Sequence, residues 1–181
     1  MTVLFDQFFE DLLKVEGGYV NDSRDSGGAT RYGITEAVAR ANGWKGAMSA
    51  LPLSLAKDIY KKQYWDSLRL DDIQNLCPAL CLKLADIAVN MGVSQAGFFL
   101  QRLLNALNNE GKLYPDIKAD GKVGPATIAT LRRFLYVRSQ HGETVMIRAL
   151  NCLQGGFYIS LAERRAKDEA FLYGWLLNRI D

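Results

Sequence analysis

The chain has 181 residues, of which 49% are hydrophobic, and a formal net charge of +2 from 22 basic and 20 acidic side chains. This length fits one ordinary domain or two small lobes, and the apolar content excludes wholesale disorder. The balanced charge excludes a nucleic-acid binder recognised by charge alone, although slight basicity suits an anionic polymer.

The first residues do not have the pattern of a signal peptide, because acids stand where a basic region is needed. No stretch approaches the roughly 20 apolar residues that span a bilayer. We therefore expect a protein without a membrane segment, made in a reducing cytosol, whose three cysteines are free thiols. If it works elsewhere, something else must release it.

Apolar residues recur with a helical period along most of the chain. Residues 3–16 form an amphipathic helix that the glycine pair at 17–18 ends. Thr35 is expected to cap a short helix that stops at Gly43, and Ser54 to cap the next one. Only residues 28–35 favour strand pairing, as a small β-hairpin.

The second half of the chain also reads as helices. Residues 77–92 are apolar almost all round, which predicts a buried helix. Ser94 starts the following helix, Pro125 occupies the first turn of another, and two more fill residues 143–180. The fold class is mainly α. A seam near residues 92–94 is expected to separate lobes 1–92 and 93–181, the second packed on the first.

Glu16 continues the apolar face of the first helix. It follows Leu12 by four residues and Phe8 by eight, so its carboxyl group extends the buried stripe. Desolvation there is expected to raise its pKa and keep it protonated near neutrality. A general acid that protonates a glycosidic oxygen needs this property. The alternative is a helix-terminal glutamate that curls into water.

Two further acids follow Glu16 in a glycine-rich segment. Asp22 and Asp25 come six and nine residues later, in a stretch that two adjacent glycines turn back. Glycoside hydrolysis needs a second, ionised carboxylate, which such a loop can supply. Alternatives are an Asx-turn for Asp22 and an arginine salt bridge for Asp25. Because Thr35 is explained as a cap, Thr30 is the hydroxyl expected to position the attacking water.

These residues carry a resemblance. The Glu16, Asp25 and Thr30 spacing is similar to that of phage-type lysozymes, with one residue fewer before the threonine. Three segments resemble successive motifs of glycoside hydrolase family 108: EGGYVNDSRDSGGATRYGIT, IYKKQYWD and ADIAVNMG. The members of this family are phage and prophage N-acetylmuramidases. Two more resemble the helical peptidoglycan-binding region that follows in that family: DGKVGPATIATL and ERRAKDEAFLYGWLLNRI. Ser23 replaces the family's usual proline.

The resemblance implies a lysozyme-like helical bundle with Glu16 as the catalytic acid. The implied endolysin cleaves the β-1,4 bond between N-acetylmuramic acid and N-acetylglucosamine in peptidoglycan, without metal or cofactor. The lysozyme spacing implies that Asp25 and Thr30 act with Glu16 in catalysis. Because the spacing differs by one residue, Asp22 and Thr35 stay open as alternatives for these two roles. Alternatives are a lytic transglycosylase using Glu16 alone and a non-catalytic cell-wall-binding module. A separate holin would deliver the protein.

Polysaccharide sites use aromatic faces together with amide or carboxylate side chains. We expect these residues to bind substrate: Tyr19, Asp22, Tyr32, Thr35, Tyr64, Asp86 and Asn90. For Tyr64, core packing is the alternative. Lys83, Asp86 and Asn90 form one polar line on an apolar helix, which must face solvent, a partner or a cleft. The resemblance through ADIAVN favours Asn90 beside Glu16.

The cysteines do not predict a metal site. Cys77 and Cys81 lie one helical turn apart, but zinc needs further ligands and only Cys152 and His141 remain. We expect Cys77 and Cys81 to be buried thiols.

Overall fold

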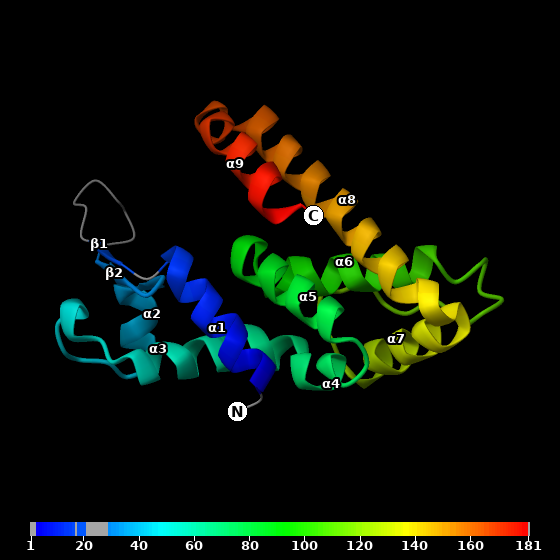
Figure 1. The fold of residues 1–181 in the computed structure, drawn as a ribbon, viewed down its shortest axis with the longest axis horizontal. Helices are drawn as coiled ribbons and strands as arrows, with labels where there is room; N and C mark the ends of the chain where they lie inside the picture. Colours follow the sequence, from blue (N-terminus) through cyan, green and yellow to red (C-terminus); the bar gives the residue numbers. More distant parts are fainter. Residues whose placement is uncertain (1–2, 17, 21–28, 181) are drawn as a thin grey trace. The chain divides into compact units, whose positions relative to one another are not determined.

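The computed structural model describes residues 3–16, 18–20 and 29–180, and most of them are helical (Figure 1). The α-helices are α1 (Val3–Glu16), α2 (Glu36–Ala41), α3 (Leu53–Tyr60), α4 (Leu70–Gln74), α5 (Pro78–Met91), α6 (Val93–Ala106), α7 (Pro125–Arg138), α8 (Gly142–Arg164) and α9 (Glu169–Arg179). Short 3₁₀ turns are η1 (Met48–Ala50), η3 (Asp66–Leu68), η4 (Ser139–His141) and η5 (Ala166–Asp168). The predicted mainly α, lysozyme-like fold is confirmed.

A three-stranded antiparallel sheet of β1 (Tyr19–Val20), β2 (Thr30–Arg31) and β3 (Ile34–Thr35) follows α1. The β2–β3 pair is the hairpin predicted near residues 28–35. Tyr32 and Gly33 form its turn with φ of 53° and 72°, the left-handed backbone that two-residue hairpins require. The sequence did not predict β1, because two residues give no alternating pattern.

The chain divides into two compact units, Met1–Ser67 and Leu68–Asp181. The predicted seam near residues 92–94 falls inside the second unit, between α5 and α6, which pack against each other. The division of the chain into functional regions 1–92 and 93–181 therefore stays a prediction. Within the described residues, no helix combines the length and apolarity needed to cross a bilayer.

Aromatic residues form the core of the first unit. The ring of Phe5 packs edge-on against Trp65 at 5.1 Å, and the ring of Phe9 lies 5.7 Å from Tyr60. Trp65 belongs to η2 (Lys61–Trp65), a π-helical turn that continues α3. The predicted capping role of Ser54 is wrong: Pro52 is the N-cap residue of α3, so Ser54 lies inside the helix. Proline pre-sets the backbone there without a side-chain hydrogen bond.

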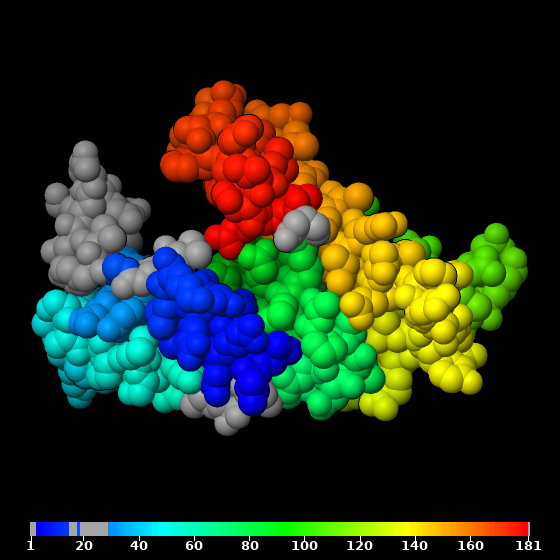
Figure 2. All heavy atoms as spheres, viewed as in Figure 1, coloured from blue at the N-terminus to red at the C-terminus, as the bar shows by residue number. Residues whose placement is uncertain are grey.

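Helix α5 is central to the second unit, as its apolar composition predicts. Its buried residues are Leu80, Cys81, Leu84, Ala85, Ile87 and Ala88, and it packs against α4, α6 and α8. Pro125 occupies the first turn of α7, as predicted. Helix α9 packs on α8. In the space-filling view, α9 and the end of α8 rise from the rest of this unit as an orange-to-red arm (Figure 2).

Gly97 of α6 allows the following loop to cross the helix closely. A Cβ atom at Gly97 would lie 2.2 Å from the carbonyl oxygen of Gly121, a backbone atom that cannot rotate away. We expect Gly97→Ala to lower the free energy of unfolding by about 1–3 kcal/mol, because the loop must shift. Urea denaturation measures this change.

Gly156 of α8 provides the control, since a Cβ there meets no heavy atom within 4 Å. Gly156→Ala is expected to raise the unfolding free energy by about 0.5–1 kcal/mol, because alanine loses less backbone entropy in a helix. Equal stabilities for the two variants would contradict the close approach at Gly97.

Candidate active site

Glu16 is the last residue of α1, at the point where the helix gives way to the sheet. Phe5, Phe9 and Leu12 precede it on α1 and are 0%, 2% and 9% exposed, whereas Phe8 of the predicted stripe is half-buried. The side chains of Glu16 and Tyr19, and all of Asp22 and Asp25, lie outside the described part of the chain. Their catalytic and binding roles stay predictions.

The sheet brings the two ends of the acidic segment together. Val20, before that segment, pairs with Thr30, after it. Thr30 also pairs with Thr35 on β3, and residues directly opposite each other place their side chains on one face of a sheet. The two hydroxyl candidates left open by the sequence are therefore neighbours, and Thr30 is the one on the strand next to β1, which follows Glu16.

Thr35 has the capping role that the sequence predicted. Its backbone is extended, and its Oγ1 accepts a hydrogen bond from Val38 N at 3.4 Å at the start of α2. The backbone N–H of Glu36 donates to the carbonyl oxygen of Ala29 at 3.0 Å. These bonds tie the hairpin to α2, so Thr30 is held on a short and fixed strand.

Tyr32 lies at the tip of the hairpin, partly exposed. The Tyr60 hydroxyl on α3 donates to the carbonyl oxygen of Tyr32 at 3.2 Å, which anchors the turn. The Arg31 guanidinium lies 4.9 Å from the centre of the Tyr32 ring and donates to its hydroxyl oxygen at 3.0 Å. Tyr32 has a positive φ, which is uncommon for a residue other than glycine, and these contacts hold it there. The direction of its side chain is therefore fixed by its surroundings.

Tyr64 stacks on Tyr60, with ring centres 5.3 Å apart and an interplanar angle of 26°. Tyr60 is 3% exposed, whereas Tyr64 stays partly exposed, and burial raises the pKa of the Tyr64 phenol. Tyr60 thus links two predicted sugar-binding residues, Tyr32 and Tyr64. Tyr60 precedes Tyr64 by one helical turn, but no local pattern indicates its contact with Tyr32, 28 positions away.

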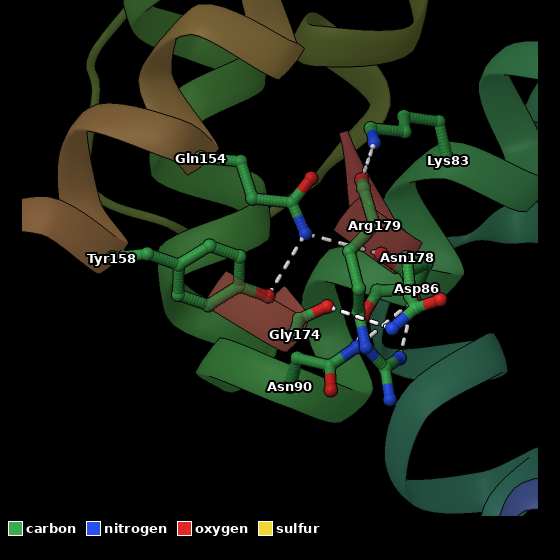
Figure 3. A network of polar contacts seen from close by, with 8 residues as sticks. All are labelled: Lys83, Asp86, Asn90, Gln154, Tyr158, Gly174, Asn178 and Arg179. Carbon is green, nitrogen blue, oxygen red and sulfur yellow. Dashed lines mark hydrogen bonds and ion pairs between the residues drawn. The ribbon is translucent and has the colours of Figure 1, made fainter. Parts of the chain in front are cut away.

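Asp86 and Asn90 lie on α5 in the second unit, within a polar network (Figure 3). The Asp86 carboxylate accepts hydrogen bonds from Arg179 at 2.8 Å, Asn90 at 2.9 Å and Gln154 at 3.1 Å. Asn90 also donates to the Asp86 carbonyl oxygen at 2.7 Å. The network joins α5 to α8 and α9, so the predicted polar line faces intramolecular partners. The substrate-binding roles of Asp86 and Asn90 stay predictions.

Lys83 and Tyr158 complete this network. The Lys83 ammonium group donates to the carbonyl oxygen of Arg179 at 2.7 Å, and Gln154 donates to the Tyr158 hydroxyl at 3.1 Å. Gln154 is fully buried. The sequence missed Arg179 and Gln154, because no local pattern pairs residues that lie 93 and 68 positions from Asp86.

The Asp86–Arg179 pair is expected to contribute measurably to stability. The two side chains are only 29% and 22% exposed, so water screens their attraction less than at the surface. A double-mutant cycle of Asp86→Ala and Arg179→Ala should give a coupling free energy of about 1–2 kcal/mol in urea unfolding. The exposed Lys112–Glu110 pair is the control, expected below about 0.5 kcal/mol. An equal coupling free energy in both cycles would contradict a stabilising role for the Asp86–Arg179 pair.

Cys77, the N-cap residue of α5, and Cys81 within α5 are buried thiols, as predicted. The Cys77 thiol donates to Glu143 Oε2 at 3.1 Å and the Cys81 thiol to the carbonyl oxygen of Leu70 at 3.5 Å. Burial raises the pKa of Cys77 to about 11 and that of Cys81 to about 12. Cys152 is exposed. In the described ranges, no three His, Cys, Asp or Glu side chains group as metal ligands would.

Comparison with known protein families matches residues 9–92 to Glycosyl hydrolase 108 and residues 95–180 to a Predicted Peptidoglycan domain. No curated protein is significantly similar to the chain. Among solved structures, SagA of Brucella abortus is similar, with 25% sequence identity and a TM-score of 0.59 over 95% of each chain.

Proposed function

Residues 9–92 of this chain belong to the Glycosyl hydrolase 108 family and residues 95–180 to the Predicted Peptidoglycan domain family, and on this basis we propose an N-acetylmuramidase. The two memberships make the protein a peptidoglycan hydrolase. The proposal adds the bond: β-1,4, between N-acetylmuramic acid and N-acetylglucosamine. The proposed enzyme is an endolysin of a phage or prophage. It is made in the bacterial cytoplasm and released to the cell wall through a holin.

The proposal rests on the junction between α1 and the sheet. Glu16 ends a helix whose buried face it continues, and the next strand leads through the Val20–Thr30 pair to the threonine predicted to hold water. This junction lies inside the family match. A glutamate at the end of a helix, followed by a strand that pairs with the strand of Thr30, supports Glu16 as the group that gives a proton to a leaving oxygen.

In the proposed mechanism, Glu16 donates its proton to the glycosidic oxygen as the bond breaks. Asp25 activates the water or stabilises the positive charge that develops at the sugar, and Thr30 helps to place that water. Asp22 is the alternative carboxylate, and Thr35 the alternative hydroxyl. Thr35 Oγ1 accepts the cap bond from Val38 N.

Tyrosine faces are proposed to hold the glycan near this junction. Tyr32 on the hairpin and Tyr64 on η2 are partly exposed and are connected through Tyr60. Rings held in this way can stack on sugar rings without losing much rotamer freedom. Tyr19, Asp22, Asp86 and Asn90 are proposed as further substrate contacts.

Release of soluble fragments from dye-labelled peptidoglycan tests the proposal. The full chain is expected to release dye in proportion to enzyme concentration. A non-catalytic cell-wall-binding module would sediment with the walls and release none, and that result would overturn the proposed activity.

A further inference from the structure

A groove of about 340 Å³ lies between α6 and α8 in the second unit and contains none of the residues predicted for catalysis. Its lining includes Phe98 and Arg102 of α6 and Cys152, Gly156, Phe157 and Arg164 of α8. Phe98 and Arg102 lie four positions apart on α6, and Cys152, Gly156 and Arg164 lie four and eight positions apart on α8, which places each set on one helix face. All of them fall within the match to the Predicted Peptidoglycan domain.

The floor of the groove is apolar. Phe157 packs edge-on against Phe99 with ring centres 6.4 Å apart, and Phe98 is exposed at the edge. Gly156 leaves the middle of the groove open, since a Cβ atom there would meet no heavy atom within 4 Å. The groove can therefore receive small apolar groups against its aromatic side chains.

The groove also carries two positive charges without a negative one. Arg102 and Arg164 both line it, and none of its lining residues is acidic. The whole chain, in contrast, is nearly balanced, with 22 basic and 20 acidic residues. Arg164 uses Nε to donate to the carbonyl oxygen of Ser160 at 2.8 Å, which orients its guanidinium group. Guanidinium groups bind carboxylates through paired N–H donors.

We infer that this groove binds the stem peptide of peptidoglycan, a short peptide with free carboxylates beside methyl side chains. Arg102 and Arg164 bind the carboxylates, and the phenylalanines contact the methyl groups. This inference rests on the proposed function for the choice of polymer. The stem peptide is favoured over the glycan, because its carboxylates carry a charge opposite to that of Arg102 and Arg164, whereas sugar hydroxyls carry none.

Two pairs of matched variants test the groove. Arg102→Gln removes a groove charge, and Arg148→Gln removes an exposed charge on α8 outside the groove lining. Gly156→Leu fills the groove, and Gly174→Leu makes the same change in α9, where a Cβ also meets no heavy atom within 4 Å. None of the four residues is proposed for catalysis, so dye release by the full chain should persist in all variants.

Binding of purified stem peptide to the full chain is measured by calorimetry and by protection of Cys152 from iodoacetamide at pH 8. The label is selective because Cys77 and Cys81 are buried with raised pKa values. We expect the peptide to slow Cys152 alkylation. Arg102→Gln and Gly156→Leu should weaken binding by about tenfold or more, and both controls by less than about twofold.

Peptide-free glycan strands serve as the second probe. If glycan protects Cys152 and the stem peptide does not, or if the groove variants bind the peptide like their controls, the inference is overturned. Dye release distinguishes this failure from that of the proposed function. A chain that cleaves peptidoglycan without binding stem peptide contradicts only the groove, and one that binds stem peptide without cleaving contradicts only the hydrolase.

Discussion

Replacing Glu16 by glutamine is expected to slow peptidoglycan cleavage by about 10²–10⁴-fold while the fold is retained. Glutamine has nearly the shape of a glutamic acid side chain but does not donate a proton to a leaving oxygen. The residue ends α1 beside the sheet, so the change removes the proposed acid without disturbing the helix interior. Initial rates of dye release from labelled peptidoglycan measure the effect.

Glu10→Gln is the matched control, because Glu10 lies on the same helix and is exposed. It should cleave at the wild-type rate, and both variants should have wild-type circular dichroism and urea midpoints. If Glu16→Gln cleaves as fast as Glu10→Gln, Glu16 is not the catalytic acid and the proposed mechanism is wrong.

Shortening the chain to residues 1–92, where the glycosidase match ends, is expected to destroy the native packing of α5. This helix buries six residues and packs against α4, α6 and α8, two of which the shortening removes. Each large apolar side chain that becomes exposed costs about 1.5–3 kcal/mol. The loss at Leu80, Leu84 and Ile87 alone approaches the whole stability of a typical domain, about 5–15 kcal/mol.

Residues 68–181 form the contrasting fragment, since they keep α4 to α9 together. We expect this fragment to unfold cooperatively in urea, and the 1–92 fragment to aggregate or to lose the helical signal of α5. The opposite pattern, with 1–92 as stable as the full chain, would show that the family boundary is also the folding boundary. The activity of the 1–92 fragment should fall with its structure.

The helices were predictable because they are built from local signals. The buried spacing of Phe5, Phe9 and Leu12 gave α1, and the cap bond of Thr35 and the first-turn position of Pro125 gave the starts of α2 and α7. Ser54 shows the limit of this reasoning. A serine before an apolar run resembles a cap, but the proline two residues earlier starts the helix.

The parts that could not be predicted depend on residues far apart in the sequence. The polar line on α5 indicated that Asp86 needs a partner. Nothing in the sequence identified Arg179 as that partner, because the two residues lie 93 positions apart and only the folded chain brings them together. The contact of Tyr60 with Tyr32 is of the same kind. The candidate site was therefore predicted as a set of residue types, and the structure supplied the links between the tyrosines.

The masses and reducing-end sugars of the fragments that the wild-type chain releases from purified peptidoglycan distinguish an N-acetylmuramidase from its alternatives. An N-acetylmuramidase produces fragments that gain one water per cut and end in reducible N-acetylmuramic acid. Fragments that end in an anhydro sugar, lighter by that water, would identify a lytic transglycosylase. Fragments that end in N-acetylglucosamine would contradict the proposed bond.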